Sequence, residues 1–210
     1  ERSRGLGDVY KRQVMHGGLT GLVHGADSAP ADIVVSMERM SEIEQVDSLG
    51  RPMIVQAGVP LQQIHEAAAE HGLMFPVDLG ARGSCQIGGN VATNAGGLRV
   101  IRYGMIRENI LGLEAVLADG SIVSSLNHMI KNNSGYDLKQ LFIGSEGTLG
   151  VVTRLVLRLR TTLAAQHTAL VAIDNYDSVL KFLSHLDGCL LYTSDAADEG
   201  LGVDLGGRRI

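Results

Sequence analysis

The sequence predicts an α+β fold, and three segments carry that prediction. A short run rich in β-branched residues, 53–57, precedes a stretch whose apolar side chains recur at helical spacing, which indicates a strand followed by a helix. Asp119 and Gly120 separate two strand-like runs, as in an antiparallel hairpin. From Val151 apolar and basic side chains alternate, which is typical of a strand with one buried face.

The first part of the chain is expected to contain two buried strands. Residues 32–37 and 53–57 are short apolar runs with β-branched side chains, which favour a buried position in a sheet. Residues 42–49 between them are expected to form a hairpin-like excursion. The first two strands are therefore predicted to be separated by a turn.

A helix is predicted directly after the second strand. Pro60 suits its first turn, because proline has a helical φ and lacks an N–H that would find no partner there. Leu61, Ile64 and Ala68 follow at helical spacing, and Gly72 is expected to end the helix.

The second half is expected to continue the sheet and then to begin a second domain. Residues 110–117 and 121–125 should form the two strands of the hairpin, because aspartate and glycine at its turn tolerate positive φ. A further strand at 168–173 and a helix at 175–186 would open the next domain. The strand from Val151 is predicted to bury one row of side chains and to expose the other, respectively Leu155, Leu157, Leu159 and Arg154, Arg158, Arg160.

Both ends of the chain resemble translated sequencing-library adapters. Residues 1–13 and 189–210 are therefore expected to be non-native and to contribute little ordered packing, and they are excluded from the fold prediction. The native segment is then expected to be 14–188, with both natural termini missing.

Composition excludes several classes of protein. The formal net charge is −5, and it does not change when the two ends are removed, because they carry equal numbers of basic and acidic side chains. This balance argues against binding to nucleic acid or to a polybasic-type membrane site. No apolar run approaches the roughly 20 residues needed to span a bilayer. Of the two cysteines, Cys85 and Cys189, only the first lies in the native segment, which excludes an internal disulfide and fits a reducing compartment.

Glycine is concentrated in three loops, which we call loop 1 (residues 17–21), loop 2 (76–97) and loop 3 (144–150). In loop 1, absent side chains let backbone N–H groups converge on an anion, although a tight turn is the alternative for this loop taken alone. Loop 2 combines glycines with small hydroxyl and amide residues, which would let a flat ring or a diphosphate lie against the backbone. Loop 3 runs directly into a predicted strand, and its alternative is again a turn.

Several competing motifs are absent. No G-x-G-x-x-G follows a strand and no G-x-x-x-x-G-K occurs, which argues against a Rossmann nicotinamide site and a P-loop. The G-x-S-x-G of many hydrolases is also missing. The seven histidines show no spacing of a helical metal site.

The order of the three loops resembles the FAD-binding domain of the vanillyl-alcohol-oxidase family, also called the PCMH type. The resemblance covers nearly all of residues 14–160 and is closest to the FAD-linked 2-hydroxyacid dehydrogenases, a branch with glycolate oxidase, D-lactate dehydrogenase and D-2-hydroxyglutarate dehydrogenase. Residues 130–153 are especially similar to the D-2-hydroxyglutarate type. The resemblance implies an FAD-binding PCMH-type domain of two α/β subdomains at 14–160, and the truncated start of an α+β substrate domain at 161–188.

The resemblance also assigns a contact to each loop. Loop 1 would bind the FAD diphosphate, loop 2 would lie along the flavin and diphosphate, and loop 3 would contact adenine and ribose. Leu19 departs from the asparagine or glycine usual in the family. The residues that match are Gly17, Gly18, Thr20 and Gly21 in loop 1, Asp78, Gly80, Ser84, Gly88, Thr93, Asn94 and Gly96 in loop 2, and Glu146, Gly147, Gly150, Val151 and Val152 at loop 3.

FAD is expected to be bound non-covalently. Some members of the family attach flavin through a histidine after the first glycine pair, but Leu19 occupies that place, and Cys85 lies three residues too close to the glycines for the alternative cysteine link. The resemblance places any divalent metal, the carboxylate-binding arginine and the base histidine in the missing substrate domain. No catalytic residue is therefore predicted in this chain.

The implied activity is oxidation of a small D-2-hydroxyacid to the 2-oxoacid, with hydride transfer to flavin N5 and reoxidation by a quinone or an electron-transfer flavoprotein. The full-length protein would be of bacterial type and cytoplasmic, with membrane association through the acceptor as the variant, whereas this fragment would be inactive. Two alternatives stay open because fold does not fix function. One is a transferase like alkylglycerone-phosphate synthase, and the other is a non-catalytic flavin-binding subunit or fragment.

Overall fold

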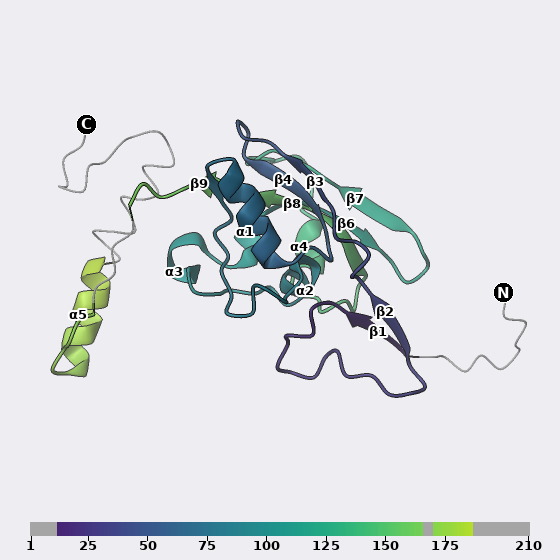
Figure 1. The fold of residues 1–210 in the computed structure, drawn as a ribbon, viewed down its shortest axis with the longest axis horizontal. Helices are drawn as coiled ribbons and strands as arrows, with labels where there is room; N and C mark the ends of the chain where they lie inside the picture. Colours follow the sequence, from purple (N-terminus) through teal and green to yellow (C-terminus); the bar gives the residue numbers. More distant parts are fainter. Residues whose placement is uncertain (1–11, 166–169, 187–210) are drawn as a thin grey trace, which may run out of the picture. The chain divides into compact units, whose positions relative to one another are not determined.

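The computed structural model describes residues 12–165 and 170–186, and the chain divides into two compact units after Thr162. The first unit combines helices with three sheets, which confirms the predicted α+β class (Figure 1). Within the described residues, no helix is long and apolar enough to cross a membrane.

A five-stranded antiparallel sheet lies at the centre of the first unit (Figure 1). Its strand order is β3 (Ile43–Val46), β4 (Pro52–Gln56), β8 (Val151–Arg158), β6 (Ile110–Val116) and β7 (Ile122–Ser125). The predicted hairpins are confirmed as β3–β4 and β6–β7. Strand β8 lies between them, with Val156 opposite both Ile54 and Gly112, so the segment that follows loop 3 joins the two hairpins.

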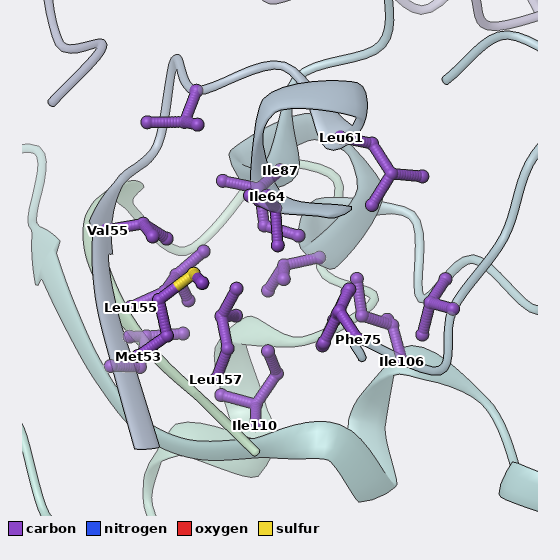
Figure 2. Close-up of a cluster of buried hydrophobic side chains, with 14 of the residues drawn as sticks. Met53, Val55, Leu61, Ile64, Phe75, Ile87, Ile106, Ile110, Leu155 and Leu157 are labelled. Atoms are coloured by element: carbon purple, nitrogen blue, oxygen red, sulfur yellow. The ribbon is translucent and has the colours of Figure 1, made fainter. Parts of the chain in front are cut away.

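Helices α1 (Leu61–Glu70) and α2 (Ile87–Ala92) supply the other half of the core. Figure 2 shows Leu61 and Ile64 of α1 and Ile87 of α2 projecting toward the side chains of the sheet. Leu61, Ile64 and Ala68 are completely buried, as their spacing predicts. Pro60 is the residue before the first helical turn, and Gly72 follows the C-cap with φ of +67°, a conformation that favours glycine.

The predicted strand from Val151 is confirmed, but it is more buried than expected. Leu155, Leu157 and Leu159 are at most 1% exposed. Val156, which alternation places on the other face, is also completely buried, because β8 is a central strand. The opposite row is therefore half-buried, and its Arg154 pairs with acidic side chains.

The remaining elements of the first unit are short. Strand β1 (Gln13–His16) pairs in parallel with β2 (Ile33–Ser36), and β5 (Leu73–Met74) pairs antiparallel with β9 (Arg160–Thr161). Single turns of helix occur at α3 (Val100–Tyr103), η1 (Ile106–Asn109) and α4 (Lys139–Phe142).

Three sequence predictions are wrong in detail. The strand at 32–37 forms as β2, but all four of its side chains are exposed, because the described residues supply no layer over it. In the β6–β7 turn only Gly120 has positive φ, since the loop follows the three-residue pattern in which the last residue alone is left-handed. Residues 170–173 form no strand, whereas 168 and 169 lie outside the described residues.

The second unit contains the predicted helix, α5 (Tyr176–Leu186). Asn175 caps its first turn, because its side-chain oxygen accepts a hydrogen bond of 2.9 Å from the backbone N–H of Ser178.

The expectation of little packing at the ends lies mostly outside the described residues. At two residues it does not hold. Gln13 pairs with Ile33 in the β1–β2 sheet, and the guanidinium of Arg12 lies 2.9 Å from the carboxylate of Asp32.

An ion-pair network connects three strands of the central sheet. Arg154 of β8 donates two hydrogen bonds to the carboxylate of Glu44 in β3 and lies 3.7 Å from the carboxylate of Glu114 in β6. Thr153 donates a hydrogen bond of 2.9 Å to the same Glu114 carboxylate. The hydrogen bonds from Arg154 hold the pKa of Glu44 below its ordinary value.

This lowered pKa predicts an acid-sensitive contribution to stability. The stabilisation is complete above the pKa of an unfolded glutamate, about 4.3, and it is lost as the pH falls through the lower pKa of folded Glu44. Glu44→Gln is therefore expected to lower the free energy of unfolding by about 1 kcal/mol at pH 7, with a smaller difference near pH 3. Urea unfolding at both pH values measures it, with the exposed Glu70→Gln as control. An equal loss at both pH values would contradict the electrostatic origin.

Candidate functional site

The three glycine-rich loops come together on one side of α2. Loop 1 follows β1 directly and lies against loop 2, since a Cβ placed on Gly18 would lie 1.9 Å from the carbonyl oxygen of Ser84. Only a residue without a side chain allows these two backbones to approach so closely. The junction of loops 1 and 2 is therefore set by Gly18.

Loop 3 is bound to the other end of α2. The backbone N–H of Gly144 donates to the carbonyl of Val91 at 3.0 Å, and that of Glu146 donates to Ala92 at 2.8 Å. These are carbonyls of the last helical turn, which have no partner within the helix. Loops 1 and 3 thus flank opposite ends of the same short helix.

Each loop contains a non-glycine residue in the left-handed region of φ. These residues are Leu19 in loop 1 (φ 54°), Asn94 in loop 2 (φ 49°) and Glu146 in loop 3 (φ 53°). Such conformations are costly for residues other than glycine, asparagine and aspartate, and they often occur at binding sites. The strain is therefore concentrated where the three loops meet.

The strain at Leu19 predicts a stabilising substitution. Leu19→Asn is expected to raise the free energy of unfolding by about 1 kcal/mol, because asparagine adopts the left-handed region at lower cost. Chemical denaturation of the two proteins measures the difference. Leu22→Asn is the matched control, since Leu22 is 93% exposed in the same segment and has no positive φ. An equal gain from both substitutions would show that removal of exposed apolar surface, not backbone strain, is responsible.

Asp78 organises the start of loop 2. Its carboxylate is buried and lies 3.5 Å from the guanidinium groups of both Arg82 and Arg99. Its carbonyl accepts a hydrogen bond of 2.9 Å from the N–H of Leu98. The structure therefore places Asp78 as a link between the two ends of loop 2, and its predicted contact with the cofactor stays a prediction.

The predicted glycines fall into two groups. Gly21 and Gly80 have open space where a side chain would stand, so their backbone is accessible to a ligand. Gly88, Gly96 and Gly150 instead have packing reasons, because a Cβ on them would lie 2.6 Å from the side chain of Ala57, 3.0 Å from that of Met105 and 2.9 Å from the carbonyl of Val116, respectively.

The hydroxyl and amide residues of loop 2 differ in what they leave free. The hydroxyl of Thr93 donates to the carbonyl of Gly89 at 3.0 Å, so its lone pairs remain for a ligand. Among the described residues, the buried side-chain oxygens of Asn94 and Gln86 have no hydrogen-bond partner. Unsatisfied buried acceptors are rare in proteins, and two of them occur in this loop.

The other predicted residues lie where their loops meet the solvent or the sheet. Thr20, Ser84 and Glu146 are exposed, and Gly17 and Gly147 are half-buried. Val151 and Val152 pair with Val116 and Ala115 in the central sheet, and Val152 is 7% exposed. Contact of these two valines with a ligand would have to use their backbone.

Arg107 supports loop 3, although no sequence motif singles it out. One of its terminal nitrogens donates to the carbonyl and the side-chain oxygen of Gln140, at 2.8 and 2.7 Å, and the other donates to the carbonyl of Ile143. These bonds fix the chain immediately before Gly144. No local sequence pattern predicts them, because the partners are more than thirty residues apart.

The cysteine in loop 2 is poorly suited to covalent chemistry. Cys85 is 2% exposed, and burial raises the pKa of its thiol. The side chain of Asn90 donates to its sulfur at 3.5 Å. The nucleophilic thiolate is therefore disfavoured. In the part of the chain that the structure describes, no group of three or more histidine, cysteine, aspartate or glutamate residues could hold a metal ion.

The fold and the loops have matches among known proteins. A family model described as an FAD binding domain matches residues 10–125. The chain is 47% identical over 168 residues to a D-2-hydroxyglutarate dehydrogenase of Xanthomonas citri pv. viticola, which is 80% of this chain and 36% of that protein. It is 45% identical over 165 residues to the mitochondrial D-2-hydroxyglutarate dehydrogenase of Bos taurus, which is 79% of this chain and 30% of that protein.

Among solved structures, the chain resembles an alkyldihydroxyacetonephosphate synthase with a TM-score of 0.64 and 24% identity, over 73% of this chain and 28% of that one. This likeness shows the fold. The chain spans about a third of the length of the curated relatives that it matches.

Proposed function

Because this chain belongs to the family of FAD-binding domains, we propose that it provides the FAD site of an oxidoreductase that converts a small D-2-hydroxyacid to the 2-oxoacid. The convergence of the three loops around α2 carries the proposal. Loop 1 reaches the backbone of loop 2 at Ser84, and loop 3 donates hydrogen bonds to Val91 and Ala92. One elongated ligand could contact all three loops there.

The residues present fit FAD in their chemistry. Open backbone at Gly21 and Gly80 offers surfaces on which a diphosphate or a flat ring can lie. The unpartnered oxygens of Gln86 and Asn94 can accept hydrogen bonds from hydroxyl or N–H groups of the cofactor. Non-covalent binding is favoured because Leu19 has no nucleophilic atom and the Cys85 thiol is buried.

When bound, FAD supplies hydride acceptance at flavin N5. The residues of this chain would hold and orient the cofactor, and they would not take protons from the substrate. We propose that the groups that bind the hydroxyacid, its base and any divalent metal belong to a substrate domain outside residues 14–160. We further propose a quinone or an electron-transfer flavoprotein as the electron acceptor, and a cytoplasmic protein that reaches a membrane through that acceptor.

D-2-hydroxyglutarate is the substrate that the relatives favour. The two curated relatives described above are both named D-2-hydroxyglutarate dehydrogenases, at 47% and 45% identity. The structural likeness to alkyldihydroxyacetonephosphate synthase has 24% identity and supports the fold alone. The transferase and the non-catalytic subunit are therefore alternative outcomes of the test below.

The test uses the full-length protein encoded by the gene that contains this sequence. Its visible spectrum is recorded while D-2-hydroxyglutarate, D-lactate and glycolate are added in turn under anaerobic conditions. Bleaching of a bound flavin band by one of these acids is the expected result. A bound flavin that none of them bleaches would favour the transferase or the non-catalytic subunit, and a protein that binds no flavin would overturn the proposed site.

A further inference from the structure

We propose that Gln86 is a further cofactor-contacting residue, whose buried side-chain oxygen accepts a hydrogen bond from a hydroxyl group of FAD next to the diphosphate. The inference rests on the proposed function, because it requires FAD to lie in the three loops. It adds a polar side chain at the junction of loops 1 and 2, where the family resemblance assigns mainly glycine backbone.

The position of Gln86 is fixed by its backbone. It is the N-cap of α2, its carbonyl accepts a hydrogen bond of 3.0 Å from the N–H of Asn90, and it forms an isolated β-bridge with Pro60. The next residue, Ile87, donates to the carbonyl of Val59 at 3.0 Å and is completely buried. Gln86 therefore has little freedom to move toward the solvent.

Its side chain faces loop 1. Gln86 is 8% exposed, and a Cβ placed on Gly17 would lie 3.5 Å from its side-chain oxygen. That separation is an ordinary van der Waals contact, so the fold itself would accept alanine at position 17. The missing side chain at Gly17 leaves the oxygen open on the side where loop 1 is expected to hold the diphosphate.

The unsatisfied oxygen indicates which chemical group should meet it. A buried acceptor without a donor is costly, so a partner is expected in the functional state. Diphosphate oxygens are themselves acceptors and cannot serve. The donors that flank the diphosphate of FAD are hydroxyls, on the ribityl chain at one side and on the adenosine ribose at the other.

Gln86→Met tests the inference, because methionine keeps the length of the side chain and removes its hydrogen-bonding groups. The dissociation constant for FAD, measured by titration calorimetry on the 210-residue chain, is expected to rise about tenfold. The melting temperature of the cofactor-free protein should stay unchanged or increase, because an unsatisfied polar group has been removed. A purely structural role predicts the reverse, a lower melting temperature with unchanged affinity, and would overturn the proposal.

Two further variants make the result specific. Gln63→Met changes an exposed glutamine of α1 and should alter neither quantity. Gly17→Ala places a methyl group beside the Gln86 oxygen and should weaken FAD binding without lowering the melting temperature. Unchanged affinity in both Gln86→Met and Gly17→Ala would overturn the proposal even if FAD binds.

The source of the hydroxyl is determined with two parts of the cofactor. Loss of affinity of Gln86→Met for FMN but not for ADP would assign the ribityl chain, and the opposite result would assign the ribose. Failure of the unchanged chain to bind FAD would overturn the proposed function along with this inference. FAD binding that is insensitive to the change at Gln86 would overturn the inference alone.

Discussion

Replacing Gly18 by alanine is expected to lower the affinity for FAD by at least about 100-fold, which corresponds to nearly 3 kcal/mol. The new Cβ would lie 1.9 Å from the carbonyl oxygen of Ser84 and 2.8 Å from the Cα of Cys85. Neither backbone can retreat easily, because the N–H groups of Ser84 and Cys85 both donate to Ala81 at 2.9 Å. Loop 1 must therefore move away from loop 2, and the diphosphate site that the two are proposed to share is separated.

Calorimetric titration of FAD into the variant measures this loss. Gly25→Ala is the matched control, because it adds the same methyl group a few residues further on, where the nearest atom is 4.0 Å away. The control should bind FAD like the unchanged chain. Equal binding by Gly18→Ala would show that loop 1 does not form part of the cofactor site.

Arg107→Met is expected to lower the free energy of unfolding by about 3 kcal/mol. Hydrogen bonds from a charged donor contribute roughly 1.5–3 kcal/mol each, and their loss leaves acceptors without partners. Arg107 makes three such bonds, to two oxygens of Gln140 and to the carbonyl of Ile143. Because these residues precede Gly144, loop 3 should also loosen, and FAD binding should weaken by about tenfold.

Denaturant unfolding and FAD titration on the same samples measure the two effects. Arg102→Met is the control for loss of an arginine, because Arg102 is exposed and stacks over the ring of Tyr103. Its effect should stay below about 1 kcal/mol. Arg107→Lys, which keeps the charge but not the two-pronged geometry, should lie between the control and Arg107→Met. A loss of stability without any loss of affinity would separate loop 3 from the cofactor site.

Elements with a local signal were predictable from the sequence. The spacing of Leu61, Ile64 and Ala68 predicts α1, and Asp119 with Gly120 predicts the β6–β7 hairpin, because each pattern reflects contacts between near neighbours. The order of strands was not predictable in this way. Strand β8 pairs with β4 and β6, both distant in sequence, and alternation along β8 carries no information about its neighbours.

The candidate site divides along the same line. The composition of the three loops predicts where a ligand could lie, but it does not separate glycines with open space, such as Gly21, from glycines needed for packing, such as Gly88. That difference depends on Ala57, which lies in another part of the chain. Arg107 and Gln86 were missed for the same reason, since their importance arises from distant backbone atoms.

The short parallel sheet of β1 and β2 affects how the protein behaves at high concentration. Ile33, Val34 and Val35 of β2 are 44%, 44% and 36% exposed, and among the described residues no third strand pairs with this sheet. An apolar strand with an unpaired edge is a template for intermolecular pairing. Self-association should therefore begin at this edge, and Val34→Lys should raise the protein concentration at which light scattering appears.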